Sequence, residues 1–358
     1  MFSPEQYRAL REGAGLMDRS DRGRLLLTGE DRRTYLQGLL TNDIAALTAG
    51  TGCYAALLTP QGRMIADMRV LELGDAIAID LEGCVRETVR DRLDQFIFSE
   101  DAQVIDITDA RAQLGVYGRS AAAVVAQALR TITQLEDRAP SSAEIEAMSL
   151  HANARWDLDG SPMVLVRSDD LGVAGFEVFA DSQRAEVIRQ ALHAAGASDV
   201  DRETAEVCRI EAGRPLFGVD MDEDTIPLEA GIEDRAISLT KGCYVGQEII
   251  IRVLHRGHGR VVRRLVGLTL EATNSVPAHG DAIRSGEREI GRVTSAAISP
   301  TVGRAIALGY VHRDFTQPGT AVKVVTSRGE EIAAITELPF VRDANVGRGL
   351  QTAPRGGA

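Results

Sequence analysis

The chain has 358 residues, and its 40 Lys and Arg residues against 52 Asp and Glu residues give a formal net charge of −12 at pH 7. At about 150 residues per domain, this length predicts two or three domains, each large enough to bury a core. A net negative charge repels polyanions, so we do not expect nucleic acid as a partner. A hydrophobic content of 44% and a charged content of 26% exclude a largely disordered or membrane-embedded chain.

The sequence also indicates a cytoplasmic protein with no membrane partner. No stretch approaches the roughly 20 consecutive apolar residues that span a bilayer, and residues 1–18 carry charges where a secretory signal would be apolar. The cysteines are few and form no CxxC pair, as is typical of a reducing compartment. They are Cys53, Cys84, Cys208 and Cys243.

The first 141 residues alternate between extended and helical patterns, which predicts an α+β unit. Residues 23–29 are predicted as a buried strand, and Asp31 stands where it can cap a helix with apolar residues at helical spacing. Pro60 and Gly62 suit a type I turn between two later strands. The later strands are expected at residues 54–58, 64–71 and 76–81, and helices at residues 85–96 and 121–129.

The rest of the chain divides into a mixed segment and a β-rich segment. In the mixed segment we expect strands at residues 163–166 and 175–179 and helices at residues 182–193 and 202–212. The β-prone pieces beyond Gly259 are short and separated by Gly and Pro, which predicts a small barrel or sandwich. They cover residues 261–270, 290–297, 305–311 and 321–325, and residues 343–358 are expected to form a disordered tail.

We expect no metal site. The acidic run Asp220 to Asp224 resembles the start of a calcium loop, but Thr225 replaces the glycine at the sixth position and Gly231 replaces the glutamate at the twelfth. An ion bound there would lack both the sharp turn and the bidentate ligand, so a solvated acidic loop is the better interpretation.

Residues 241–248, with the sequence KGCYVGQE, are the most informative stretch for chemistry. They precede an apolar run, residues 249–254, that continues as a predicted helix. Cys243 would then lie near a helix N-terminus and beside Lys241, and both features favour a thiolate with a low pKa. A buried structural cysteine explains the same pattern equally well.

This octapeptide resembles the K-G-C-[FY]-x-G-Q-E signature of the YgfZ branch of folate-binding proteins, relatives of the glycine-cleavage aminomethyltransferase or T-protein. The residues that match the motif are Lys241, Gly242, Cys243, Tyr244, Gly246, Gln247 and Glu248. The resemblance extends over nearly the whole chain except the tail. Its other segments are residues 18–20, 36–43, 60–63, 209–213, 226–231 and 291–295.

The resemblance implies an α+β fold in which three domains form a ring around a central folate site. In this interpretation residues 1–48 and 142–255 form a discontinuous first domain and residues 49–141 form the second. Residues 256–342 would form a C-terminal β-barrel. Tetrahydrofolate or a derivative is the implied cofactor.

The resemblance also assigns roles to four residues. Asp67 would lie near the reactive folate nitrogen, and Glu177 would hold the pterin, because one carboxylate can accept from an amide N–H and an adjacent amino group. Tyr54 would form an aromatic wall of the pocket, and Arg209 would lie at the folate site. The alternative for both carboxylates is a solvent-facing position on a strand, with Asp67 and Arg69 sharing an exposed face.

Two departures from the T-protein pattern decide the functional hypothesis. Residues 169–174 replace a Tyr-Thr-Gly-Glu-type stretch and lack its ligand-lining tyrosine, whereas T-proteins lack a cysteine at the position of Cys243. We therefore expect a tetrahydrofolate-binding protein that supports iron–sulfur cluster assembly or repair in client enzymes. Cys243 would be its essential thiol, and its partners would be folate and iron–sulfur client or assembly proteins.

Two other hypotheses remain open. The first is a folate-dependent aminomethyltransferase, in which Asp67 acts electrostatically on the folate nitrogen or carries a proton. The second is an interaction scaffold that has lost its ligand, which the altered residues 169–174 would explain.

Overall fold

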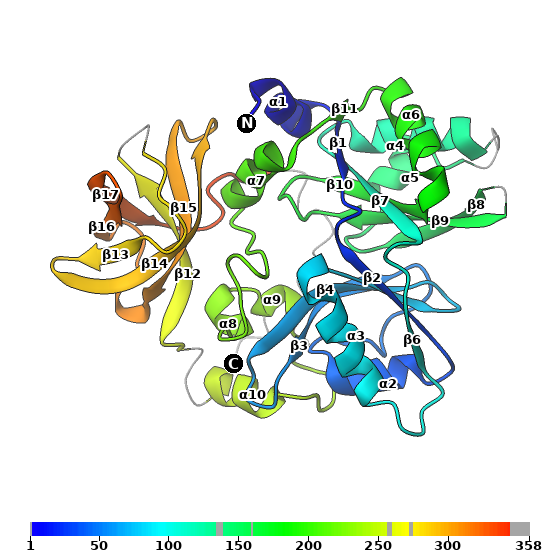
Figure 1. Ribbon diagram of the computed structural model, residues 1–358, viewed down its shortest axis with the longest axis horizontal. Coiled ribbons are helices and arrows are strands. Elements are labelled where there is room, and N and C mark those ends of the chain that lie inside the picture. Colours follow the sequence, from blue (N-terminus) through cyan, green and yellow to red (C-terminus); the bar gives the residue numbers. More distant parts are fainter. Residues whose placement is uncertain (1, 134–138, 159, 256–259, 272–274, 344–358) are drawn as a thin grey trace, which may run out of the picture.

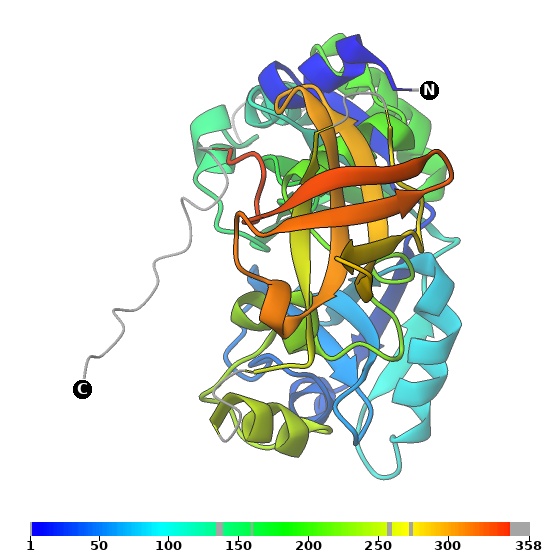
Figure 2. The same ribbon diagram turned by 90° about the vertical axis from the view of Figure 1, so that its left-hand side faces the viewer.

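The computed structural model describes residues 2–133, 139–158, 160–255, 260–271 and 275–343. Two open sheets lie one above the other, and a closed β-barrel stands beside them (Figure 1). Short helices of the central part of the chain lie between the barrel and the sheets (Figure 1). With the barrel turned toward the viewer, Figure 2 shows it in front of both sheets.

The upper sheet has the strand order β11-β1-β7-β10-β9-β8, with all pairs antiparallel except β1 and β11. Its strands are β1 (Gly15–Asp18), β7 (Arg111–Tyr117), β8 (Asn153–Leu158), β9 (Ser161–Ser168), β10 (Gly175–Asp181) and β11 (Ser198–Asp199). Three helices pack on one face and bury Leu16, Val116, Leu165 and Phe176. They are α4 (Ala121–Thr133), α5 (Ser142–Glu146) and α6 (Ala185–Ala194).

The lower sheet is antiparallel throughout, with the order β3-β4-β5-β2-β6. Its strands are β2 (Gly23–Thr28), β3 (Gly52–Leu58), β4 (Met64–Glu72), β5 (Ile77–Leu81) and β6 (Gln103–Asp106), and its helices are α2 (Arg32–Leu39) and α3 (Arg86–Gln95). Asp31 does precede α2, but its side chain makes no capping bond to the helix and accepts instead from the backbone N–H of Asp101 at 2.8 Å.

The two sheets look toward one another with the faces that point away from α4–α6 in the upper sheet and from α2 and α3 in the lower sheet. Part of this interface is apolar, through Leu71 of β4 and Val164 and Val166 of β9. Beside it lie charged side chains that are almost completely enclosed, Arg69, Asp80 and Glu177. Buried charges are tolerated only when they are paired, so this interface positions a network of ion pairs rather than a simple apolar core.

The chain crosses to the barrel through several short helices. They are α7 (Arg202–Glu211), α8 (Pro227–Ala230), α9 (Glu233–Ala236) and α10 (Gln247–His255), while α1 (Pro4–Glu12) packs on α7. The closed barrel has the order β12-β15-β14-β13-β16-β17. Its strands are β12 (Arg263–Leu270), β13 (Ala282–Ser285), β14 (Arg288–Ser299), β15 (Arg304–His312), β16 (Ala321–Thr326) and β17 (Gly329–Thr336). The 3₁₀ helices are η1 (Gly83–Val85), η2 (Ser182–Arg184) and η3 (Arg313–Phe315).

The predicted α+β fold with a small C-terminal barrel is confirmed, and each strand predicted between residues 23 and 325 overlaps an observed one. In the barrel the sequence analysis missed β13 and β17, which are short or rich in exposed charge and carry a weak apolar pattern. In the two open sheets it missed β1, β6, β7, β8 and β11. The helix predicted over residues 249–254 is present as α10, but it begins only at Gln247, so the expected position of Cys243 near its N-terminus is wrong.

The predicted domain boundaries, after residues 48 and 141, remain a prediction. The two sheets do not follow these boundaries. Strand β2 belongs to the sheet of β3–β6, and β7 belongs to the sheet of β8–β10. Of the expected disordered tail, residues 344–358 lie outside the described part of the chain. No helix among the described residues is long and apolar enough to cross a membrane.

Candidate active site

A pocket of about 80 Å³, which we call the inner pocket, lies where the two sheets meet the loop that follows α7. Its wall includes Tyr54 and Asp67 and is unusually rich in arginine. The arginines are Arg19, Arg22, Arg69, Arg209, Arg214 and Arg235. Three of the four predicted folate-site residues, Tyr54, Asp67 and Arg209, are therefore brought together although they are far apart in sequence.

Tyr54 and Asp67 form the reactive pair of the inner pocket. They lie on the paired strands β3 and β4, and the Tyr54 hydroxyl donates to Oδ2 of Asp67 at 2.5 Å. Burial raises the pKa of Asp67 to about 6, although the hydrogen bond from Tyr54 opposes this shift. A carboxyl group with a pKa near neutrality can take up or release a proton under physiological conditions.

Arg235 completes the surroundings of this pair. Its guanidinium carbon lies 4.8 Å from the centroid of the Tyr54 ring, within the range of a cation–π contact. Burial and the neighbouring Asp67 carboxylate raise the pKa of Tyr54 well above its usual value. Tyr54 therefore stays protonated and serves as a hydrogen-bond donor.

Glu177 lies behind the wall of the inner pocket, where it pairs with Arg69. Arg69 donates from Nη1 to Oε1 of Glu177 at 3.1 Å and from Nη2 to Oε2 at 2.5 Å. Tyr117 donates to Oε1 at 2.6 Å, and the Gln113 side-chain amide donates to Oε2. Burial opposes ionisation, but the charges of Arg69 and Arg19 outweigh it and hold the pKa of Glu177 well below its usual range.

This arrangement bears on the predicted role of Glu177. The residue is fully buried, and both of its oxygens already accept two hydrogen bonds each. It does not line the inner pocket, whereas Arg69 does. Its direct contact with a pterin stays a prediction, and it requires Arg69 to move first.

Asp170 is the carboxylate that the inner pocket exposes beside this network. Its Oδ2 lies 3.6 Å from Nη2 of Arg19 and 3.7 Å from Nη1 of Arg69. Burial disfavours its ionised form, but the charge of Arg69 outweighs burial and lowers the pKa of Asp170. The altered stretch 169–174 thus supplies the pocket with an acceptor in place of the missing tyrosine.

Arg209 lines the inner pocket, but its hydrogen bonds hold the barrel to α7. Nη1 donates to Asp220 at 2.7 Å, Nη2 donates to Ser295 of β14 at 2.9 Å, and the remaining donors are taken by Glu206 and the carbonyl of Arg214. The geometry therefore gives Arg209 a structural role, and its predicted contact with folate remains a prediction.

A wider chamber of about 440 Å³ adjoins the inner pocket, and we call it the outer chamber. The two share Arg214, Pro215 and Arg235 in their walls, and the outer chamber continues between α9 and barrel strand β12. Arg214 pairs with Asp169, and Arg235 lies 3.7 Å from the same carboxylate. Arg264, which pairs with Glu233 at 3.3 Å, and Glu337 also line the outer chamber. With three arginines against one glutamate in its lining, the outer chamber favours a ligand with negative charge.

The Cys243 motif lies elsewhere. Cys243 is an exposed free cysteine and does not line either chamber. Lys241 does not stabilise a thiolate there, because its ammonium group donates to the carbonyls of Gln37, Leu40 and Asn42 at 2.7, 2.6 and 2.8 Å. Burial lowers the pKa of Lys241 to about 8. The motif therefore anchors a loop to the end of α2, and the expected activation of Cys243 by Lys241 is wrong.

Sequence reasoning missed Arg69, Asp170 and Arg235 as site residues. The alternation along β4 suggested an exposed face for Asp67 and Arg69, but Arg69 is only 2% exposed because the upper sheet covers it. One signal was available: Arg69 stands within the apolar run Met68 to Leu71, where an unpaired charge would be costly. Its partners could not be read from the sequence, because they lie 11 and 108 positions away.

Comparison with known proteins identifies the family. The family model for the GCVT N-terminal domain matches residues 2–241, and the model for the glycine cleavage T-protein C-terminal barrel domain matches residues 263–342. The chain belongs to the glycine cleavage T-protein family.

Individual relatives agree with this membership. An aminomethyltransferase from Thermosynechococcus vestitus is 30% identical over 342 residues, which cover 94% of this chain and 87% of the relative. An aminomethyltransferase from Streptomyces avermitilis is 31% identical over 345 residues, covering 94% and 89%. The crystal structure of the glycine cleavage system aminomethyltransferase T from Bartonella henselae shares the fold, with a TM-score of 0.83 at 23% identity, over 95% of this chain and 91% of that one.

These findings correct the leading functional hypothesis. A role in iron–sulfur cluster assembly, with Cys243 as the essential thiol and iron–sulfur proteins as partners, is contradicted by full-length relatives that are named aminomethyltransferases. The expectation failed because it gave two short segments, residues 169–174 and 241–248, more weight than the rest of the chain. The alternative hypothesis of an aminomethyltransferase is the one that the comparisons favour.

Proposed function

We propose that this protein is a folate-dependent aminomethyltransferase, which transfers an aminomethyl group from a loaded carrier protein to tetrahydrofolate. The observation that carries the proposal is the half-buried, hydrogen-bonded pair of Asp67 and Tyr54 in the wall of the inner pocket, where burial raises the pKa of the Asp67 carboxyl group to about 6. Membership of the T-protein family supports both the reaction class and the predicted cofactor.

The residues present fit tetrahydrofolate. A pterin offers N–H donors, and Asp67 and Asp170 provide carboxylate acceptors in the inner pocket. The glutamate tail of folate carries carboxylates, which match Arg214, Arg235 and Arg264 of the outer chamber. The inner pocket is small, but the outer chamber, at about 440 Å³, lies in the range of about 300–1,000 Å³ typical of ligand sites.

Within this site each residue of the chain has a defined task. Bound tetrahydrofolate would supply the nitrogen nucleophile that accepts the one-carbon group. Asp67 holds a proton at Oδ1 or Oδ2 and, when ionised, stabilises positive charge that develops nearby. Tyr54 fixes the orientation of Asp67 by donating to Oδ2, and Arg235 fixes the ring of Tyr54.

The narrower resemblance to the YgfZ branch depends on residues 241–248 and on the altered residues 169–174. It gains no support from the relatives, and Cys243 lies outside both chambers. The proposal therefore assigns the activity to the Asp67 site and gives the motif a structural role through Lys241.

One observation favours the scaffold hypothesis as a second candidate. Arg69 donates to the carboxylate of Glu177, and the inner pocket has a volume of only about 80 Å³. An apolar cavity of about 150 Å³ holds benzene, so the smaller inner pocket admits only an edge of a bicyclic ring in this conformation. A protein that had lost folate binding would show the same closed pair.

Calorimetric titration with 5-formyltetrahydrofolate, followed by a transfer assay with an aminomethyl-loaded carrier protein, tests the proposal. We expect saturable binding, and turnover that falls by at least about a hundredfold in Asp67→Asn. The matched control is Asp91→Asn, which alters an exposed aspartate of α3 and should leave both measurements unchanged. Binding without turnover would contradict the transferase, and absence of binding would favour the scaffold.

A further inference from the structure

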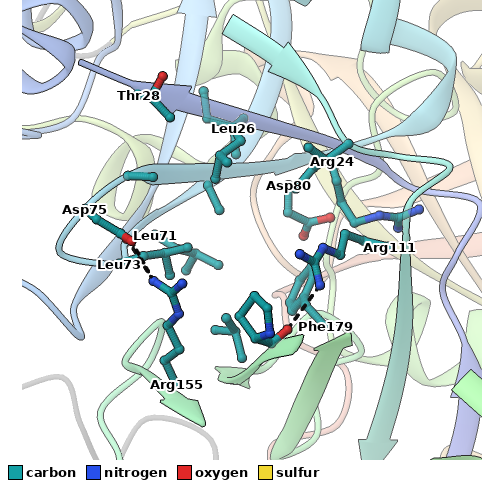
Figure 3. Close-up of a pocket in the computed structure, with 16 residues that line it drawn as sticks. Arg24, Leu26, Thr28, Leu71, Leu73, Asp75, Asp80, Arg111, Arg155 and Phe179 are labelled. Atoms are coloured by element: carbon teal, nitrogen blue, oxygen red, sulfur yellow. Dashed lines mark hydrogen bonds and ion pairs between the residues drawn. The ribbon is translucent and has the colours of Figure 1, made fainter. Parts of the chain in front are cut away.

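A second cavity, of about 270 Å³, lies between the facing sides of the two sheets, and we call it the inter-sheet cavity (Figure 3). Strands β2, β4 and β5 of the lower sheet form one wall, and β7 to β10 of the upper sheet form the other. It shares no lining residue with the inner pocket or the outer chamber. An inference about it is therefore independent of the proposed transferase.

The walls of the inter-sheet cavity are mainly apolar. Leu26 and Leu71 come from the lower sheet, Ile107 follows β6, and Val164 and Phe179 come from the upper sheet. A dry cavity of about 150 Å³ holds benzene, so this one has room for a ligand of about ten non-hydrogen atoms. Apolar side chains on both sides favour a flat or branched hydrocarbon group.

One end of the cavity carries positive charge without a partner. Among the described residues, Arg111 forms no ion pair, and its one hydrogen bond goes from Nη1 to the carbonyl of Pro162 at 3.1 Å. Figure 3 shows its guanidinium group extending from β7 into the space between the sheets. Most of its donors are therefore available to a ligand.

Arg24 reinforces this charge at the same end of the cavity (Figure 3). It is only 2% exposed, its terminal nitrogens donate to neutral oxygens such as Gln113 Oε1 at 3.0 Å, and it forms no ion pair with a described carboxylate. Its Nε has no hydrogen-bond partner at all. An orphaned donor on a buried cation is costly, and an anion nearby would remove much of that cost.

The carboxylates of the cavity, by contrast, are already satisfied. Asp80 accepts from Arg22 at 2.8 Å and from Arg69. At the opposite end, Asp75 accepts from Nη1 of Arg155 at 2.9 Å through each of its oxygens. The unpaired charge of the cavity is thus positive, which selects an anionic group over a cationic one.

We propose that the inter-sheet cavity binds a small amphipathic carboxylate, such as an arylalkanoate. Its hydrocarbon part lies between Leu26 and Val164, and its carboxylate accepts hydrogen bonds from Arg111, with Arg24 adding positive potential. Arg–carboxylate pairs are strong where water is excluded, so Arg111 fixes the orientation of the ligand.

Calorimetric titration with 3-phenylpropionate and with its neutral analogue 3-phenylpropanamide tests this proposal. We expect the acid to bind saturably and the amide to bind about tenfold more weakly, because only the acid pairs with Arg111. Arg111→Gln should weaken binding of the acid about tenfold and abolish the preference over the amide. Arg202→Gln is the matched control, and we expect it to change the affinity by less than about twofold because Arg202 is exposed on α7 and does not line the cavity.

Ala78→Phe provides a test by volume, because Ala78 lines the cavity and a phenyl ring would fill it. The acid should then no longer bind. If this variant fails to fold, as judged by circular dichroism, the Arg111→Gln comparison decides alone. The proposal is overturned if wild-type protein does not bind the acid, if acid and amide bind equally, or if folded Ala78→Phe binds as well as wild type.

Discussion

Arg69 of the lower sheet and Glu177 of the upper sheet join the two sheets through a pair of parallel hydrogen bonds, at 3.1 and 2.5 Å. The two residues are 108 positions apart in the sequence. Asp80 accepts from the other side of the same guanidinium, through Nε at 2.6 Å. The pair thus connects the sheet interface with the inner pocket, which Arg69 also lines.

Removing one partner of this pair should strongly destabilise the protein. In Arg69→Met the carboxylates of Glu177 and Asp80 stay buried without their cation, and we expect a loss of about 3–5 kcal/mol in the free energy of unfolding. The double variant Arg69→Met/Glu177→Gln should lose less than the sum of the two single changes, because Gln carries no charge. Urea denaturation of the four proteins measures this cycle.

Arg90→Met is the control for this cycle. Arg90 also forms an ion pair, with Asp91 at 2.7 Å, but both side chains are exposed on α3. Its loss should leave the urea midpoint unchanged. Additive effects in the cycle would show that Arg69 and Glu177 do not act as a pair.

The pH dependence of activity should follow the pKa of Asp67. Burial raises this pKa to about 6, so a reaction that needs the carboxylate should gain rate as the pH rises through 6. Tyr54→Phe removes a hydrogen bond that stabilises the ionised form, and the acidic limb should therefore move to higher pH. Rates of aminomethyl transfer measured from pH 5 to pH 8, that is from about one unit below the pKa of Asp67 to about two units above it, check this prediction. A limb that stays in place would exclude Asp67 as the titrating group.

The same shift has a consequence for stability. The pKa of Asp67 in the folded state lies above its ordinary value of 3.8. The stabilisation of the folded state by the protonated Asp67 carboxyl group is therefore fully present below pH 3.8 and is lost as the pH rises through about 6. Asp67→Asn cannot ionise, so we expect its stability relative to wild type to improve between pH 4 and pH 8, a range of about four units. Thermal melting at both pH values measures the difference.

The architecture could be predicted because the alternation of apolar residues in most of the predicted strands can be read within each strand by itself. Residues 64–71 show this well, since the core positions Met64, Ala66 and Met68 alternate as a half-buried strand requires. The barrel was predicted from its spacing of short strands, although two strands were too weakly patterned to be recognised. The grouping of β2 with β3–β6 depends on long-range pairing, which no local pattern records.

The candidate site was harder to predict, because its geometry comes from contacts between distant segments. Asp67 and Tyr54 were found through a family resemblance, and without it the alternation along β4 favoured an exposed Asp67. Arg69 was assigned to solvent because the covering sheet cannot be seen in the sequence. For Cys243 the sequence predicted more than the structure contains. Its motif is distinctive, but Lys241, the residue expected to activate it, donates to three backbone carbonyls instead.

Arg209 should behave as a structural residue rather than as a folate ligand. In Arg209→Met, Asp220 loses its buried cation, and α7 loses its bond to Ser295 of the barrel. We expect a loss of about 3 kcal/mol in stability, with the dissociation constant for 5-formyltetrahydrofolate changed less than about threefold in the folded fraction. Arg202→Met, on the exposed side of α7, is the control. A large change in folate affinity without loss of stability would place Arg209 in the binding site instead.

Lys241 and Cys243 are two positions apart, and their substitutions should have opposite outcomes. Lys241→Met leaves three backbone carbonyls without their donor in a buried position, so we expect a loss of about 2–3 kcal/mol in the free energy of unfolding. Cys243→Ser changes an exposed side chain outside both chambers, and should alter stability by less than about 0.5 kcal/mol and leave transfer activity unchanged. Urea denaturation and the transfer assay, run on both variants, measure these effects. Loss of activity in a fully stable Cys243→Ser protein would show that the thiol takes part in the reaction and that the Asp67 site does not act alone.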